Sequence, residues 1–107
     1  MVIFQPQRFS RTKHLWDDFV QILAQAPIDQ LILTDIYPAS EAAIPGITSQ
    51  NLVAEIQKLN PKAQIKFIPF GDHGEDILTD LNLILSKDDL LLFQGAGKVN
   101  KLIKYLL

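Results

Sequence analysis

The run Gln30-Leu31-Ile32-Leu33-Thr34-Asp35 decides the fold class of this 107-residue chain. Its centre is apolar without interruption, which is typical of a parallel strand that is covered on both faces. A second run of this kind, Leu90-Leu91-Leu92-Phe93, lies near the other end of the sequence. Buried strands that are far apart in the sequence predict a parallel α/β sheet.

Further apolar runs complete the set of expected strands. We expect the four strands at Val2–Gln5, Gln30–Asp35, Gln64–Pro69 and Asp89–Gln94. Each is followed by a segment with apolar residues at helical spacing, so strands and helices alternate along the whole chain. This βαβαβαβα order predicts a Rossmann-like three-layer sandwich in one domain. Its mainly parallel sheet would have about four or five strands, with helices on both faces.

The helices are expected to pack on the sheet through regular apolar stripes. The first is expected over Ser10–Ala26, with Ser10 as its N-cap, and the others begin near Thr48 or Ser49, after Gly74 and after Gly97. The residues expected to face inward are Leu15, Phe19, Ile22, Leu23 and Ala26, then Leu52, Val53, Ile56 and Leu59, then Ile77, Leu78, Leu81, Ile84 and Leu85, and finally Val99, Leu102, Ile103 and Leu106.

The composition narrows the range of partners. A net charge of −2 gives no basic field, so we expect no nucleic acid partner. The absence of cysteine excludes disulfides and thiolate chemistry. No apolar stretch is long enough to span a bilayer and no signal peptide is recognisable, so we expect a cytoplasmic protein without membrane contact. Because an apolar strand begins at Val2 and a helical pattern runs to Leu107, we also expect a fragment of a longer protein.

Two arginines stand out where the first strand gives way to a helix. In an open parallel sheet, ligands bind at the carboxyl ends of the strands, and Arg8 and Arg11 lie in the first loop at that edge. Paired guanidinium groups match the two oxygens of a carboxylate or the oxygens of a phosphate. The alternative is that both are solvated arginines in the first turn of a helix.

The second loop at this edge, Asp35–Gly46, is long for a strand-to-helix connection and contains two prolines. Length with stiffness suggests a binding loop, in which Asp35 and Glu41 could hold a cation or an amine. The alternative for Asp35 is a hydrogen bond to backbone within this loop. A third loop, Asp72–Asp76, is explained better as an acidic helix start than as a metal site, so no metal is expected.

Gly95-Ala96-Gly97 joins the last strand to its helix. Such a turn lets a phosphate approach free N–H groups, although a tight turn that needs glycine is the commoner explanation. It lacks the third glycine of a dinucleotide fingerprint, and no Walker loop occurs in the sequence. The chain alone therefore gives no basis for nucleotide hydrolysis.

Four segments resemble one family in the correct order. Phe4–Thr12 (FQPQRFSRT) is similar to the F-Q-P-H-R-Y/F-T/S-R-T signature in the C-terminal domain of the UDP-N-acetylmuramate–L-alanine ligases, the MurC branch of the Mur ligase family. Trp16–Phe19 resembles its Y-D-D-F helix, Asp35–Gly46 its D-V-Y-P-A-G-E…I-P-G loop, and Gln94–Gly97 its Q-G-A-G turn. The resemblance covers essentially the whole chain.

The resemblance implies that residues 1–107 are the amino-acid-binding domain of a three-domain ligase, without its first strand and helix. That ligase uses ATP and Mg²⁺ to activate UDP-N-acetylmuramate as an acyl phosphate, to which L-alanine is added during peptidoglycan precursor synthesis. Arg8 and Arg11 would hold the alanine carboxylate, with Gln7, Asp35, Tyr37 and Glu41 as further substrate-side residues. The isolated chain would lack the N-terminal and central domains and would be inactive.

Two residues depart from the family pattern. Gln7 stands where histidine is usual, which removes any acid–base role there. Ser40 replaces a glycine, which is costly if this position needs a positive φ. The competing interpretations are a free-standing α/β module that binds a small anion or a partner at the same edge, and a receiver-like domain with Asp35 as phosphoacceptor.

Overall fold

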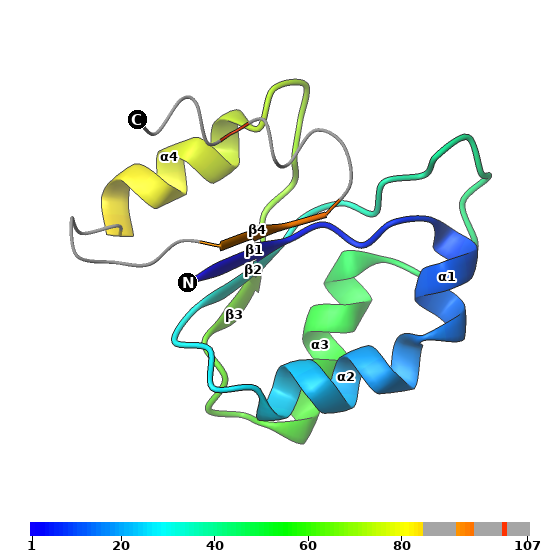
Figure 1. Cartoon of the computed structure of the whole chain (residues 1–107), viewed down its shortest axis with the longest axis horizontal. Coiled ribbons are helices and arrows are strands. Elements are labelled where there is room, and N and C mark those ends of the chain that lie inside the picture. Colours follow the sequence, from blue (N-terminus) through cyan, green and yellow to red (C-terminus); the bar gives the residue numbers. More distant parts are fainter. Residues whose placement is uncertain (85–91, 96–101, 103–107) are drawn as a thin grey trace.

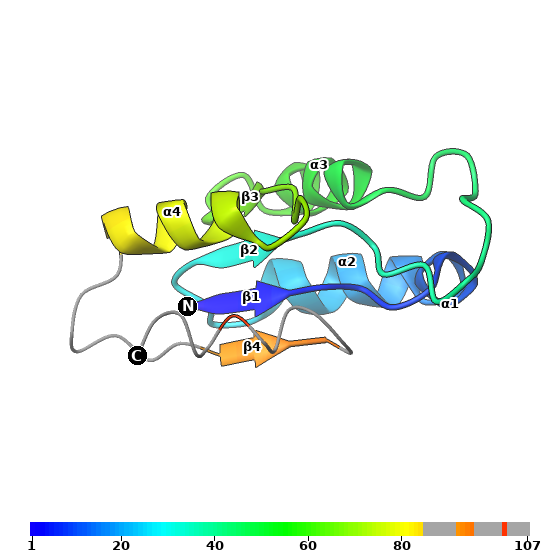
Figure 2. The same ribbon diagram turned by 90° about the horizontal axis from the view of Figure 1, so that it is seen from above.

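Four parallel strands form a single sheet in the computed structural model, which describes residues 1–84, 92–95 and 102. The strands are β1 (Val2–Phe4), β2 (Leu31–Leu33), β3 (Ile65–Phe67) and β4 (Leu92–Gln94), and they lie in the order β3-β2-β1-β4 (Figure 2). The expected parallel α/β class is confirmed. Because the chain steps from β1 to β3 in one direction and then returns to the far side of β1, the topological switch lies between β1 and β4.

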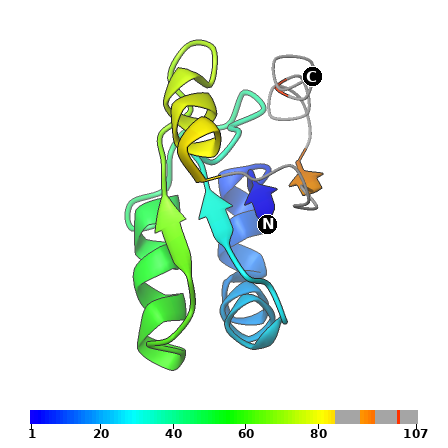
Figure 3. The ribbon, with the colours of Figure 1, turned by 90° about the vertical axis from the view of Figure 1, so that its left-hand side faces the viewer.

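The described residues form four helices, and both faces of the sheet are covered. The helices are α1 (Phe9–His14), α2 (Trp16–Gln25), α3 (Ser49–Leu59) and α4 (Glu75–Ile84). Helices α2 and α3 lie on one face and α4 lies on the other (Figures 1 and 3). Each face has its own core cluster, since Ile32 of β2 packs with Ile77 and Leu81 of α4, whereas Leu31 and Leu33 pack on the α2/α3 side. The uninterrupted apolar run of β2 is therefore buried on both faces.

The helix expected over Ser10–Ala26 is divided in two. Leu15, with φ −99° and ψ 11°, interrupts the helix between α1 and α2. The hydroxyl of Thr12 donates to the carbonyl oxygen of Arg8 one turn back, a type of bond that often bends helices. Ser10 is not the N-cap, because Arg8 occupies that position.

Two residues predicted to face inward are exposed instead. Ile22 is 63% exposed because α2 packs through Trp16, Phe19, Val20, Leu23 and Ala24, a stripe that leaves Ile22 to one side. Leu59 is 48% exposed, since it is the last residue of α3 and lines the open groove between α2 and α3. The burial of Leu52, Val53 and Ile56 is as predicted.

Helix α3 begins at Ser49, within the predicted range, and Thr48 is its N-cap, because the Thr48 hydroxyl oxygen accepts a hydrogen bond from the backbone N–H of Asn51 at 3.1 Å. The third predicted helix is α4, which buries Ile77 and Leu81 and half-buries Leu78. Most of the helix predicted after Gly97 lies outside the described residues, as do Leu85 and the strand residues 89–91. Of that helix the structure describes only Leu102, which is buried against Gly74 and the α4 side of the core.

The two-sided burial of β2 gives a direct test of the fold. Ile32 is fully buried, and Ile32→Ala leaves a cavity, so we expect the free energy of unfolding to fall by about 2–5 kcal/mol. Ile22→Ala is the matched control at an exposed position and should change the free energy of unfolding by no more than about 0.5 kcal/mol. Urea unfolding of both variants measures the difference; equal losses would contradict the assigned register.

Candidate functional site

Backbone hydrogen bonds join the first two loops at the carboxyl edge of the sheet. Beyond the ends of β1 and β2, Gln7 and Tyr37 form an isolated parallel bridge. The N–H of Tyr37 donates to the carbonyl oxygen of Pro6 at 2.8 Å. The N–H of Arg8 donates to the carbonyl oxygen of Tyr37 at 2.7 Å. Two segments about thirty residues apart in the sequence, the arginine loop and the long proline-containing loop, therefore form one surface.

Arg8 is held in an unusual conformation at this surface. Its φ of 67° is in the left-handed region, which is uncommon for a residue with a side chain. The backbone is fixed on both sides, since its N–H bonds Tyr37 and its carbonyl oxygen accepts from both the N–H and the hydroxyl of Thr12. Because the main chain is fully engaged, the exposed guanidinium is presented outward from a rigid base.

Arg11 follows one turn later in α1 and is also exposed. Within the part of the chain that the structure describes, no carboxylate forms an ion pair with either arginine. Nor does any acidic side chain lie in the first turn of α1 itself. The geometry therefore leaves two cationic groups available to an external anion, one at the N-cap of α1 and the other three residues later within the helix.

Glu41 ties the long loop to the start of α1. One carboxylate oxygen accepts from the N–H of Ser10 at 3.0 Å and the other from its hydroxyl at 2.5 Å. These bonds, led by the one from the hydroxyl, lower the pKa of Glu41; the N–H of Phe9 and the charge of Arg8 act in the same direction, whereas partial desolvation opposes them. Glu41 is thus held in place by two hydrogen bonds. The Ser10 hydroxyl donates to Glu41 and does not cap the helix.

Asp35 joins the loops that follow the first three strands. Its Oδ2 accepts a hydrogen bond from the N–H of Phe70 at 2.9 Å, and its carbonyl oxygen accepts from Nε2 of Gln5 at 3.1 Å. Asp35 therefore bonds backbone, as one interpretation of the sequence expects, but its side chain reaches the loop after β3 and does not bond within its own loop. The contact to Phe70 gives Asp35 a positioning role at this edge.

The loop after Asp35 contains a tight turn of the mirror-image kind. Ala39 and Ser40 have φ of 49° and 73°, and the N–H of Glu41 donates to the carbonyl oxygen of Pro38 at 3.0 Å. Positive φ at both central residues is the geometry of a type I′ turn, which favours glycine and asparagine. Ser40 therefore does occupy a position with positive φ, the condition under which its replacement of glycine is costly.

The glycine turn is described only at its start. Gln94 ends β4 and its carbonyl oxygen accepts the N–H of Gln5, so this turn begins directly beside the first loop. Gly95 has φ 152°. Ala96 and Gly97 lie outside the described residues.

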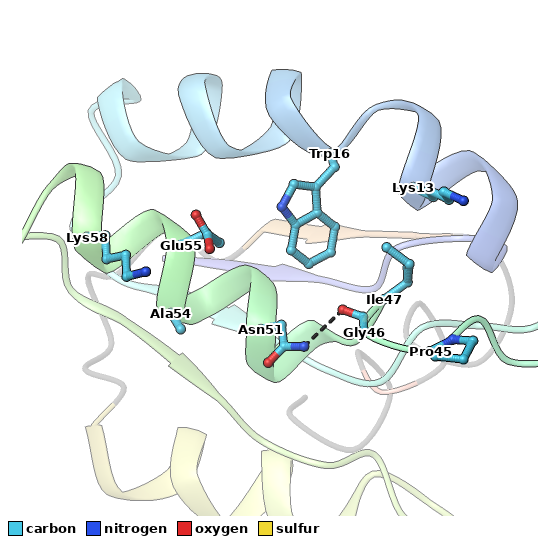
Figure 4. A pocket seen from close by; sticks show the side chains of 9 residues that line it. All are labelled: Lys13, Trp16, Pro45, Gly46, Ile47, Asn51, Ala54, Glu55 and Lys58. Atoms are coloured by element: carbon cyan, nitrogen blue, oxygen red, sulfur yellow. Dashed lines mark hydrogen bonds between the residues drawn. The ribbon is translucent and has the colours of Figure 1, made fainter.

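A groove that the sequence does not reveal lies beside this surface, between α1, α2, the segment Pro45–Ile47 and α3 (Figure 4). It has a volume of about 590 Å³. Asn51 supports its wall, because its side-chain amide donates to the carbonyl oxygen of Gly46 at 2.9 Å. The residues that line the groove are Lys13, Trp16, Pro45, Gly46, Ile47, Asn51, Ala54, Glu55 and Lys58. Trp16, Pro45 and Gly46 belong to the family-like segments Trp16–Phe19 and Asp35–Gly46, but no pattern in the sequence brings these segments together as a groove.

No protein-family model matches this chain. Across residues 1–84, 92–95 and 102, no group of three or more histidine, aspartate and glutamate side chains is arranged to hold a metal ion. In the same residues, no helix is both long and apolar enough to cross a bilayer.

The strained turn predicts a stabilising substitution. Ser40→Gly relieves the cost of a side chain at φ 73°, so we expect the free energy of unfolding to rise by about 1 kcal/mol. Ser40→Ala, which keeps the Cβ atom, is the control and should not gain stability. Thermal or urea unfolding measures both; a gain in the alanine variant as large as in the glycine variant would exclude backbone strain as the cause.

The bonds from Ser10 to Glu41 predict a pH effect. Because folding lowers the pKa of Glu41, its contribution to stability is present above the ordinary value of 4.5 and is lost as pH falls through the folded-state pKa. Ser10→Ala should raise the Glu41 pKa toward 4.5, as measured by NMR titration of its side-chain carboxyl carbon.

Glu75 provides an internal control for that titration. Its pKa is also lowered, first by its own backbone N–H and then by that of His73, and neither bond involves Ser10. The Glu75 titration should therefore be the same in both proteins. An unchanged Glu41 titration in the Ser10→Ala chain would show that the hydroxyl bond does not exist in solution.

Proposed function

We propose that this chain is the C-terminal, amino-acid-binding domain of a UDP-N-acetylmuramate–L-alanine ligase, with a Rossmann-like fold. The observation that carries the proposal is the joining of its two longest family-like motifs. Phe4–Thr12 and Asp35–Gly46 were matched independently in the sequence, and they meet through hydrogen bonds between Pro6, Tyr37 and Arg8. Motifs that serve one site are expected to lie together at the carboxyl edge.

The proposed ligand of this edge is the carboxylate of L-alanine. Arg8 and Arg11 carry five N–H donors each, in a planar arrangement that matches two carboxylate oxygens. Gln7 lies beside them and its amide could donate a further hydrogen bond, but it cannot transfer a proton near neutral pH. Positive charge at this place would also stabilise the oxyanion that forms when the amine of alanine attacks an acyl group.

The remaining substrate-side residues hold the edge in shape. Tyr37 supplies backbone bonds to the arginine loop, Glu41 is engaged by Ser10, and Asp35 is engaged by Phe70. We therefore assign Asp35, Tyr37 and Glu41 to positioning rather than to direct contact with the alanine amine. This assignment differs from their role as substrate ligands in the sequence-based hypothesis.

The other reactants of the proposed ligase would be bound elsewhere. ATP with Mg²⁺ would supply the activated acyl phosphate of UDP-N-acetylmuramate, and this sequence contains no Walker loop to hold the nucleotide. We therefore propose that N-terminal and central domains provide those sites and that this chain alone does not turn over. The setting would be the cytoplasmic synthesis of peptidoglycan precursors, on which cell shape and division depend.

The carboxylate role of Arg11 can be tested in the complete natural protein. With ATP, UDP-N-acetylmuramate and L-alanine, Arg11→Ala should raise the KM for L-alanine by about 10–100-fold, the range expected for one lost charge-assisted hydrogen-bonding partner, and should lower kcat. Coupled phosphate release measures both constants. Lys13→Ala, which removes an exposed cation two residues away on the same helix, is the control and should leave the KM unchanged.

Three results would contradict the proposal. Equal kinetics for the Arg11→Ala and Lys13→Ala enzymes would remove the carboxylate role of Arg11. Phosphate release by the isolated 107-residue chain would show that it does not need other domains for turnover. Micromolar binding of an unrelated anion by the isolated chain, without ligase activity in the complete protein, would favour the free-standing module.

A further inference from the structure

Two buried polar atoms at the carboxyl ends of β1 and β2 have no hydrogen-bond partner among the residues that the structure describes. They are Oε1 of Gln5 and Oγ1 of Thr34. Gln5 is 4% exposed and Thr34 is fully buried, so solvent at the surface of the protein does not reach them. Buried polar groups in native proteins are almost always paired, with protein or with internal water. Two unpaired atoms near each other therefore require an explanation.

The register of the sheet places these two side chains side by side. Phe4 pairs with Leu33, so Gln5 and Thr34 are the next residues along neighbouring strands. The alternation of strand side chains puts Gln5 on the face of Ile3 and Thr34 on the face of Ile32, which is the face covered by α4. Both polar groups thus lie on one face, at the edge where the topological switch also lies.

The orientation of the Gln5 amide is fixed by its other end. Its Nε2 donates to the carbonyl oxygen of Asp35, which can only accept, so nitrogen and oxygen cannot be exchanged. Oε1 must therefore accept a hydrogen bond from another donor. Thr34 does not supply it, because its hydroxyl forms no bond to Gln5.

We propose that one internal water molecule bridges Gln5 and Thr34. It donates one hydrogen bond to Oε1 of Gln5 and forms a second hydrogen bond with Oγ1 of Thr34, so that both atoms have a partner. A cation is a poorer occupant, because both atoms are neutral and hard cations need about six oxygen ligands. The water would hold Gln5 in place, and through it the Asp35 backbone at the base of the long loop. This inference does not depend on the proposed ligase function.

Substitution of the threonine tests the bridge in solution. In Thr34→Val the shape is kept and the hydroxyl is lost, so the water loses a partner and the unfolding equilibrium should shift by about fivefold toward the unfolded chain. Thr12→Val is the matched control: its hydroxyl is equally buried and donates to a known acceptor, the carbonyl oxygen of Arg8, so it should lose stability to a similar degree. If Thr34→Val is as stable as the wild-type chain or more stable, the Thr34 hydroxyl had no hydrogen bond to a water molecule. That result overturns the proposal.

A crystal structure of the unsubstituted chain provides the second measurement and decides the question if Thr34→Val does not fold. The expected result is a density peak about 2.7–3.2 Å from both Oε1 of Gln5 and Oγ1 of Thr34. A direct hydrogen bond between the two side chains, or the absence of such a peak, overturns the proposal.

Discussion

The backbone pairing of the arginine loop with Tyr37 is the interaction on which the rest of the candidate site depends. It extends the contact between β1 and β2 beyond the strands themselves, through the N–H of Arg8 and that of Tyr37. The same pairing fixes Arg8 as the N-cap of α1, so the helix begins at Phe9, one residue before Ser10. Ser10 then lies inside the first turn, where its N–H and hydroxyl meet Glu41.

This arrangement concentrates backbone strain at one place. Of the described residues, Arg8, Ala39 and Ser40 are the ones other than glycine that have positive φ, and all three belong to the joined loops. Each such conformation costs of order 1–3 kcal/mol and persists only where neighbouring bonds determine it. At Arg8 those bonds come from Tyr37 and Thr12, and in the turn the bond comes from Pro38. Strain held by a dense local network is typical of functional sites rather than of ordinary connections.

The sequence predicted the positions of the strands well because an apolar run is a strong local signal, although Leu92 in the edge strand β4 is 48% exposed and not covered as predicted. The apolar run Leu31-Ile32-Leu33 lies on a strand whose two faces are both covered, and its flanking polar residues mark its ends. The errors came where packing between elements decides the outcome. Ile22 was placed in the core by helical spacing alone, but the side chains of Trp16 and Val20 determine which face of α2 turns toward the sheet.

The site was predictable only in part, for a related reason. The carboxyl edge and the exposed arginines follow from the order of strands and helices. The partners of Asp35 and Glu41 do not, because Phe70 and Ser10 lie 35 and 31 residues away and no pattern in the sequence links them. Likewise, the break at Leu15 depends on a local back-bond from Thr12 that helical periodicity does not register.

The anchoring of Glu41 has a consequence for the charge balance of the edge. A carboxylate that is free near two arginines would pair with them and neutralise the site for an external anion. Here both oxygens of Glu41 are occupied by Ser10, so its geometry is fixed at the first turn of α1 and neither guanidinium forms an ion pair among the described residues. Its charge still acts on Arg8 through space, as the lowered pKa of Glu41 reflects. Glu41 therefore shapes the loop, while the arginines stay available to the carboxylate of an external ligand. The hydrogen bonds from Ser10 hold Glu41 in this structural role.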